Sequence, residues 1–190
     1  MRLLYISILT CTVLVLSGCG SLLSSMGVDS IEDHPAERTM AQVIEDDNIE
    51  TKAMVNIRGE NDAYREAHLV IVSYNGYVLL AGQVVDQALK DDATKVLRNV
   101  KGVRRIYNEL EIGPPTTALT RTNDAWLTTK IKSFLLGDSD ISGTRVKVVT
   151  ENGVVYLMGL VTRKEAERIT DVAATTSGVK RVVKLFEFID

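Results

Sequence analysis

Cysteine, histidine and aromatic residues are scarce in this chain of 190 residues. It contains two cysteines and two histidines, and its aromatic content is 5%. The motifs H-x-x-x-H, C-x-x-C and G-x-S-x-G are missing, and so is a phosphate-binding loop of the P-loop type. The formal net charge is −3, whereas nucleic-acid-binding proteins usually carry a strong basic excess. The sequence therefore offers none of the common metal, nucleophile or nucleotide motifs, and it argues against a nucleic-acid partner.

The residues that could still support catalysis have simpler interpretations. His34 lies in a polar segment, and we interpret His68, at the start of a strand-like stretch, as a strand residue rather than a metal ligand. Asp91 and Asp92 lie on a predicted helix whose outer face must be solvated. A carboxylate pair for glycoside hydrolysis stays open at this stage, although small three-stranded modules seldom provide a deep pocket for one. We therefore expect a protein that is not an enzyme and that needs no metal or cofactor.

The first 18 residues have the features of an export signal. Met1 and Arg2 give a short positive start, and residues 3–16 form an apolar run that is too short to span a bilayer comfortably. The ending LSGC (residues 16–19) resembles the lipobox of bacterial lipoproteins. That resemblance implies cleavage before Cys19 and acylation of this cysteine. The alternative is an ordinary signal peptide followed by a chance cysteine.

The expected mature chain has a single cysteine, because Cys11 lies in the leader, and it can form no internal disulfide. Gly20 follows the acylation site where an inner-membrane lipoprotein would carry aspartate, which implies an outer-membrane location facing the periplasm. Residues 19–45 are mostly polar, and their apolar residues show no sustained period. We expect this segment to be a flexible tether that ends in the acylated Cys19.

The rest of the chain contains one unit twice. The phrase NGYVLLAGQV (residues 75–84) returns as NGVVYLMGLV (residues 152–161). Asn-Gly between two β-rich runs predicts a hairpin with a type I′ turn, which needs positive φ at both central residues. Gly82 and Gly159 lie at matching points of the second strands, where a glycine indicates a bulge or a close approach of backbone.

Helices flank each predicted hairpin. Asp86 can cap one following helix, and Thr162 with Glu165 forms a capping box for the other. Gly102 and Gly178 are placed to end these helices. Final strands are predicted over 103–112 and 179–189, and short first helices over 46–57 and 124–135. We thus predict an α+β protein with two α-β-β-α-β modules, at 46–112 and 123–190, joined by a linker at 113–122.

Each module has an NG-x-V-x-L-x-G hairpin and a closing GV-[RK]-R-[IV] turn, and in this pattern the chain resembles tandem BON domains. The resemblance implies a three-stranded mixed sheet with two helices on one face in each module. With the lipobox, it further implies an outer-membrane lipoprotein that binds anionic, phosphatidylglycerol-like phospholipid through the first helix of the second module. It also implies support of envelope integrity, enrichment at the division site, and links to the barrel-assembly machinery or to cell-wall amidase regulators. We expect a monomer.

The first helix of the second module has two distinct faces at 100° per residue. One arc predicts a core stripe of Leu127, Ile131, Phe134 and Leu135. The opposite arc carries the candidate phospholipid-binding residues Trp126, Thr129, Lys130, Ser133 and Leu136. An exposed tryptophan favours the membrane–water boundary, and a lysine beside it can reach an anionic headgroup. The alternative is that Trp126 packs against the linker or the first module.

The first module lacks this aromatic residue. Aligning Lys52 with Lys130 places Asn48 opposite Trp126. Residues 46–112 hold nine basic and eleven acidic residues (−2), whereas residues 123–190 hold ten and nine (+1). We therefore expect the first module to support or orient the second, which contacts lipid.

Two rival functions remain open. Trp126 could be a hot spot for a periplasmic protein partner. A glycan-binding module would need aromatic residues exposed on a sheet face or in a groove. The candidates for that role lie in strand-like stretches, where sheet packing is the simpler use: Tyr74, Tyr77, Tyr107 and Tyr156.

Overall fold

The computed structural model describes residues 38–190, which belong to one compact unit, Pro35–Asp190. The predicted leader, the acylation site Cys19 and most of the predicted tether lie outside the described residues. The first module comprises α3 (Met40–Glu60), α4 (Ala63–Glu66), β1 (His68–Tyr74), β2 (Tyr77–Val84), α5 (Gln87–Arg98), β3 (Arg105–Asn108) and β4 (Glu111–Ile112). The second comprises α6 (Ala118–Gly137), a 3-10 turn (Gly143–Arg145), β5 (Val146–Glu151), β6 (Val154–Val161), α7 (Arg163–Ala174) and β7 (Arg181–Phe188).

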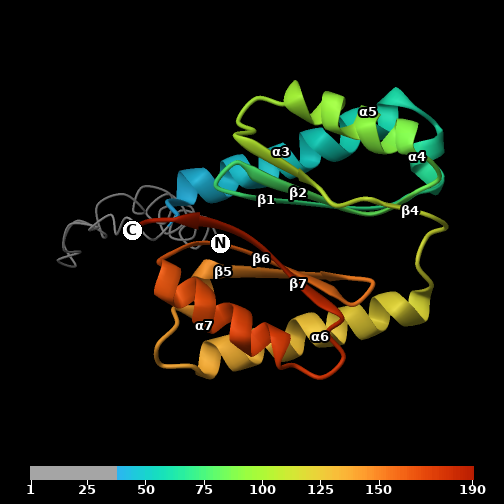
Figure 1. The fold of residues 1–190 in the computed structure, drawn as a ribbon. Coiled ribbons are helices and arrows are strands. Elements are labelled where there is room, and N and C mark those ends of the chain that lie inside the picture. The colour runs from blue at the N-terminus through green and yellow to red at the C-terminus, as the bar shows by residue number, and fades with distance from the viewer. Residues whose placement is uncertain (1–37) are drawn as a thin grey trace, which may run out of the picture. The chain divides into compact units, whose positions relative to one another are not determined.

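Each module forms a mixed sheet, as predicted. The first two strands pair antiparallel, and a later strand joins the second in parallel, giving the orders β1-β2-β3 and β5-β6-β7. In the first module β4 also pairs with β2 in parallel, beyond the end of β3. The first helix of each module and the helix after the hairpin cover one face of its sheet (Figure 1). The module is therefore the two-layer unit that the repeat predicted.

Two predicted helix starts are wrong in the same way. A capping box of Thr39 and Gln42 starts α3 at Met40, inside the expected tether. The side chain of Thr117 accepts from the backbone N–H of Thr120 and starts α6 at Ala118, inside the expected linker 113–122. In both places a threonine satisfies the first backbone donors, so the helix extends beyond the stretch with a clear apolar period.

The predicted last strand of the first module is also interrupted. The Asn108 side chain donates to the carbonyl of Lys90 at 2.6 Å and accepts from the backbone N–H of Leu110 at 3.2 Å. Lys90 Nζ in turn donates to the Leu110 carbonyl at 2.6 Å. These side chains satisfy backbone groups that a continuous strand would use, so the strand splits into β3 and β4. A further difference is the short helix α4, which the sequence pattern did not indicate.

A buried aspartate on the first helix of each module fixes the hairpin turn. Asn75 and Asn152 both have φ of 51°, and the glycines after them are also at positive φ, as a type I′ turn requires. Asp46 accepts from the backbone N–H groups of residues 75 and 76 at 2.8 and 2.9 Å. Asp124 accepts from those of residues 152 and 153 at 2.8 Å each. Each first helix is therefore joined to its own hairpin at a defined point.

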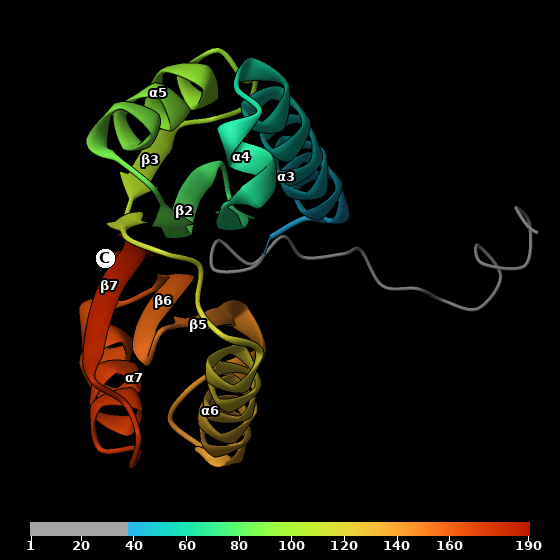
Figure 2. The ribbon, with the colours of Figure 1, turned by 90° about the vertical axis from the view of Figure 1, so that its right-hand side faces the viewer.

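The second face of each sheet is covered by the other module. The cluster that joins them contains Val72, Tyr74, Leu79, Ala81, Val154, Tyr156, Met158, Leu160 and Leu185, with Tyr77 and Tyr107 partly buried against it. Figure 2 shows the helices of each module on the side of its sheet away from this contact. The four tyrosines of the strands thus serve sheet packing, the simpler of the two uses considered for them.

Hydrogen bonds at the edge of this inter-module contact occur in equivalent pairs. Asn75 Nδ2 donates to Glu187 at 2.7 Å, and Asn152 Nδ2 donates to Glu111 at 3.2 Å. These are matching positions of the two modules, so the contact is approximately two-fold symmetric. Arg104 adds a bidentate pair to Glu187 at 2.7 and 3.0 Å.

Candidate functional site

The helix α6 presents an exposed apolar surface to solvent. Trp126 is 56% exposed and Leu136 62% exposed, whereas Leu127 and Ile131 are fully buried. Thr129 and Ser133 are exposed and Lys130 is half-buried. The five predicted site residues therefore share the outer side of one helix. The alternative that Trp126 packs against the linker or the first module is wrong.

The prediction that Phe134 belongs to the core is wrong. Its side chain is 50% exposed, and Leu135 occupies the core beside it. Eight residues after Trp126, Phe134 is turned by about 80° from it around the helix. That position is the margin between the core stripe and the outer side, and a large ring there can lie on either.

Lys130 joins these two rings. Its Nζ lies 4.8 Å from the centroid of the Trp126 ring and 5.9 Å from that of Phe134. The spacing of four residues places the three side chains in a row along the helix. A cation over an aromatic face is attracted by the ring quadrupole. The ammonium group is thus held on the outer side of α6, with apolar surface on both sides of it.

The hydroxyl groups of Thr129 and Ser133 already donate hydrogen bonds within α6. The Thr129 hydroxyl donates to the Ala125 carbonyl at 2.9 Å, and that of Ser133 donates to the Thr129 carbonyl at 3.0 Å. Each has used its one donor on the backbone of its own helix, so each can only accept a further bond. Among the five predicted site residues, the donors left for an anion are therefore the Lys130 ammonium group and the Trp126 indole N–H.

The exposed surface is also longer than predicted. Leu119, two turns before Trp126 and on the same side, is 81% exposed. It was missed because the helix was expected to start later, although the spacing of seven residues would have placed it here. We use the term α6 outer face for the residues Leu119, Trp126, Lys130, Phe134 and Leu136.

The structure holds α6 firmly in place. Its inner side is fixed by Leu127, Ile131 and Leu135, which are fully buried. Polar bonds add to this packing, from Asp124 to the hairpin turn and from the Thr128 hydroxyl to Thr150 at 2.8 Å. The outer face is therefore displayed on a rigid element.

The matching helix of the first module has exposed aliphatic residues but no ring. Met40 is 76% exposed, Ile44 57% and Val55 65%. Asn48, which aligns with Trp126, is exposed as well. The two modules thus differ in the chemistry of their outer faces more than in the amount of apolar surface.

The described part of the chain has neither a metal cluster nor a membrane-spanning helix. Across residues 38–190, no group of three or more His, Cys, Asp or Glu side chains is arranged to hold a metal ion. Within the same range, no helix is long and apolar enough to cross a membrane.

Comparisons with known proteins agree with the repeat. The BON domain model matches residues 45–114 and 123–190. The chain is 36% identical over 185 residues to the protein named outer membrane lipoprotein DolP of Haemophilus influenzae, covering 97% of this chain and 96% of the relative. It is 34% identical to a 21 kDa hemolysin of Actinobacillus pleuropneumoniae, over 80% of this chain and 78% of that one. Osmotically-inducible protein Y of Escherichia coli is 29% identical over 65% of this chain and 63% of its own length.

Two observations indicate the family, the repeated structure of the modules and the similarity of the sequence to known proteins. The hairpin turns, the buried aspartates and the helix ends repeat from one module to the other in the structure. The domain match covers both modules, and one relative aligns over nearly the whole chain. The chain belongs to the BON-domain family, with two BON domains in tandem.

Proposed function

We propose that this protein is an outer-membrane lipoprotein facing the periplasm, and that the α6 outer face binds anionic phospholipid of the phosphatidylglycerol type. The observation that carries the proposal is Lys130 held between the exposed rings of Trp126 and Phe134. Aromatic rings favour the membrane–water boundary, where the apolar part of the ring is buried and the indole N–H stays wet. The lysine beside them supplies the charge that a phosphate group needs.

The lipid anchor supports this function by proximity. The lipobox-like LSGC places an acylated Cys19 ahead of the folded unit, and one relative is named an outer membrane lipoprotein. Tethering keeps the local concentration of the protein at the membrane high, so a weak contact of α6 with lipid suffices to bias its orientation or position. The family resemblance extends the proposal to envelope integrity and to enrichment at the division site.

A second candidate function is recognition of a periplasmic protein, such as a component of barrel assembly or an amidase regulator. The observation that favours it is the size of the exposed surface, because tryptophan and other large side chains are frequent hot spots of protein interfaces. Binding to a protein would depend on that partner, whereas binding to lipid would depend on the charge of the membrane and on salt.

Tryptophan fluorescence tests the proposal directly, because Trp126 is the only tryptophan. Residues 20–190 would be titrated with phosphatidylcholine vesicles that contain or lack phosphatidylglycerol. We expect a blue shift with the anionic vesicles alone. Each basic residue close to an anionic surface is worth about 1 kcal/mol. Lys130→Glu replaces a positive charge by a negative one, a change of about 2 kcal/mol, and should therefore weaken binding about thirtyfold.

Lys52→Glu is the matched control, because Lys52 is exposed and aligns with Lys130 on the first helix of the other module. It makes the same change in net charge and should leave the affinity nearly unchanged. An emission spectrum that does not respond to anionic vesicles, or an equal loss in both variants, would contradict the proposal.

A further inference from the structure

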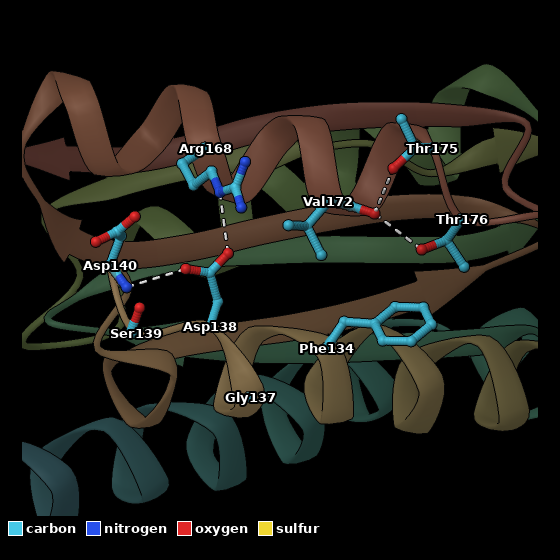
Figure 3. Close-up of a pocket in the computed structure, with 9 residues that line it drawn as sticks. All are labelled: Phe134, Gly137, Asp138, Ser139, Asp140, Arg168, Val172, Thr175 and Thr176. Carbon is cyan, nitrogen blue, oxygen red and sulfur yellow. Dashed lines mark hydrogen bonds and ion pairs between the residues drawn. The ribbon is translucent and has the colours of Figure 1, made fainter.

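A second feature of the second module lies beside the α6 outer face. An open cleft of about 470 Å³ is formed by the end of α6, the following loop and α7. Phe134 from the α6 outer face stands at its edge, and Arg168 extends across it from α7 (Figure 3). Its size lies in the range of about 300–1,000 Å³ that is usual for small-ligand pockets.

The cleft contains a positive and a negative side chain that can each form further hydrogen bonds. Arg168 Nε donates to Asp138 at 2.9 Å. Among the described residues, no hydrogen bond is found to either terminal nitrogen of Arg168, whose side chain is 57% exposed. Asp140 donates its backbone N–H to Asp138 at 3.0 Å, while its carboxylate has no bond within residues 38–190.

The balance of these charges disfavours a purely anionic ligand. Two carboxylates and one guanidinium give the cleft a net charge of about −1 at neutral pH. A phosphate without a compensating cation would meet the guanidinium but would also be repelled by both aspartates. A ligand with a phosphodiester at one end and an ammonium group at the other would satisfy both sides.

The two threonine hydroxyl groups of the cleft add acceptors rather than donors. Thr176 donates to the Val172 carbonyl at 2.8 Å, and Thr175 donates to that of Asp171 at 2.7 Å. Each can still accept a bond from an N–H group. A primary ammonium, with three N–H donors, suits such a lining better than a quaternary one.

The first module lacks this arrangement. The corresponding cleft, at the end of α3 and beside α5, is lined by Glu60, Asp86, Asp91 and Asp92, with Lys95 as its only basic lining residue among those described. Counted from the two helix N-caps, Asp92 takes the place of Arg168. The mixed cleft thus occurs in the module that also carries the aromatic outer face.

We propose that this cleft binds the phosphoethanolamine headgroup of a membrane phospholipid, with Arg168 at the phosphate and Asp140 and Asp138 at the ammonium. This proposal rests on the proposed function, because contact of the α6 outer face with a membrane brings lipid headgroups to the cleft. The two contacts are complementary: Lys130 selects anionic lipid, and the cleft selects an aminophospholipid.

The test begins with a soluble headgroup, so that it does not depend on membrane binding. Glycerophosphoethanolamine would be titrated into the ¹⁵N-labelled chain of residues 20–190. We expect saturable shifts of the backbone amides of Phe134, Ser139, Asp140 and Thr175, and weaker shifts with glycerophosphocholine. Arg168→Gln and Asp140→Asn should each weaken binding at least tenfold. Arg98→Gln, an exposed arginine of α5, is the control and should change nothing.

Vesicles identify the source of the headgroup. With phosphatidylglycerol held constant, replacing phosphatidylcholine by phosphatidylethanolamine should tighten binding severalfold, and Arg168→Gln should remove that gain while retaining the dependence on phosphatidylglycerol. Trp126→Ala should lose vesicle binding but still titrate with the soluble headgroup.

Three results would overturn the inference. They are an absence of saturable shifts around the cleft, equal binding of the choline compound, and soluble binding with no gain from phosphatidylethanolamine vesicles. Loss of all response to anionic vesicles, with the cleft still titrating, would instead count against the proposed function of the α6 outer face.

Discussion

At the scale of single residues, one buried aspartate in each module places the first helix against the hairpin turn in the same way. Asp46 and Asp124 are each 3% exposed, yet both oxygens of each carboxylate accept at least one hydrogen bond. Burial acts to raise the pKa of Asp46, but hydrogen bonds from Ser73, Gly76, Asn75 and Arg38 outweigh it and lower that pKa below its ordinary value. The folded protein therefore binds the proton of Asp46 less readily than the unfolded chain does.

This shift predicts a pH dependence of stability. A carboxylate with a lowered pKa stabilises the fold above its unfolded pKa of about 3.9, and the stabilisation is lost as the pH falls through the folded value. Asp46→Asn should lower the free energy of unfolding at neutral pH by about 1–3 kcal/mol. It should also lose less stability than the wild type on acidification. Urea unfolding at several pH values measures both effects, with the exposed Asp47→Asn as control; parallel pH profiles would contradict the assignment.

At the scale of the element, α6 shows what a helical wheel can and cannot predict. The pattern correctly placed Leu127, Ile131 and Leu135 in the core and Trp126 on the outer side, because apolar periodicity follows the helix geometry. It misplaced Phe134, since a residue at the margin of the stripe is decided by the packing of neighbouring elements. The buried Asp124 was missed, although its alignment with Asp46 under the Lys52–Lys130 register was visible in the repeat.

The corrected position of Phe134 leads to a second prediction. Phe134→Ala should change the free energy of unfolding by less than about 1 kcal/mol, because surface substitutions usually have small effects. Its affinity for anionic vesicles should nevertheless fall, since one of the two rings beside Lys130 is removed. Leu135→Ala, one residue later in the core, should cost about 2–5 kcal/mol. Thermal unfolding and vesicle sedimentation distinguish the two variants, and similar losses of stability would place Phe134 in the core after all.

At the scale of the whole described unit, the main feature that the sequence analysis missed is the contact between the sheets. The repeat predicted the two modules. No sequence motif, however, indicates that the sheet of one module packs against the sheet of the other. A clue was present in the second strands: YVLLAGQV and VVYLMGLV are almost continuously apolar, and β2 and β6 are buried along nearly their whole length. Strands with one solvated face alternate instead, so this composition indicates burial on both faces.

Separation of the modules should therefore expose an apolar sheet face. A chain of residues 38–113 would uncover Leu79 and Ala81, which are fully buried in the inter-module contact. We expect this fragment to bind a hydrophobic dye and to self-associate, as exposed apolar patches do. Light scattering after gel filtration would measure the association, and Leu79→Lys in the fragment should reduce it. A monomeric fragment that binds no dye would show that the sheet face is stable in water.

The two-fold relation between the modules has a consequence for the history of the chain. In a dimer of identical single modules, every substitution would occur on both subunits at once. Two copies in one polypeptide are free of that constraint, so one copy can carry Trp126 and Arg168 while the other carries Asn48 and Asp92. A pair of similar folds can in this way present two sides of unlike chemistry, which a dimer of identical modules cannot do.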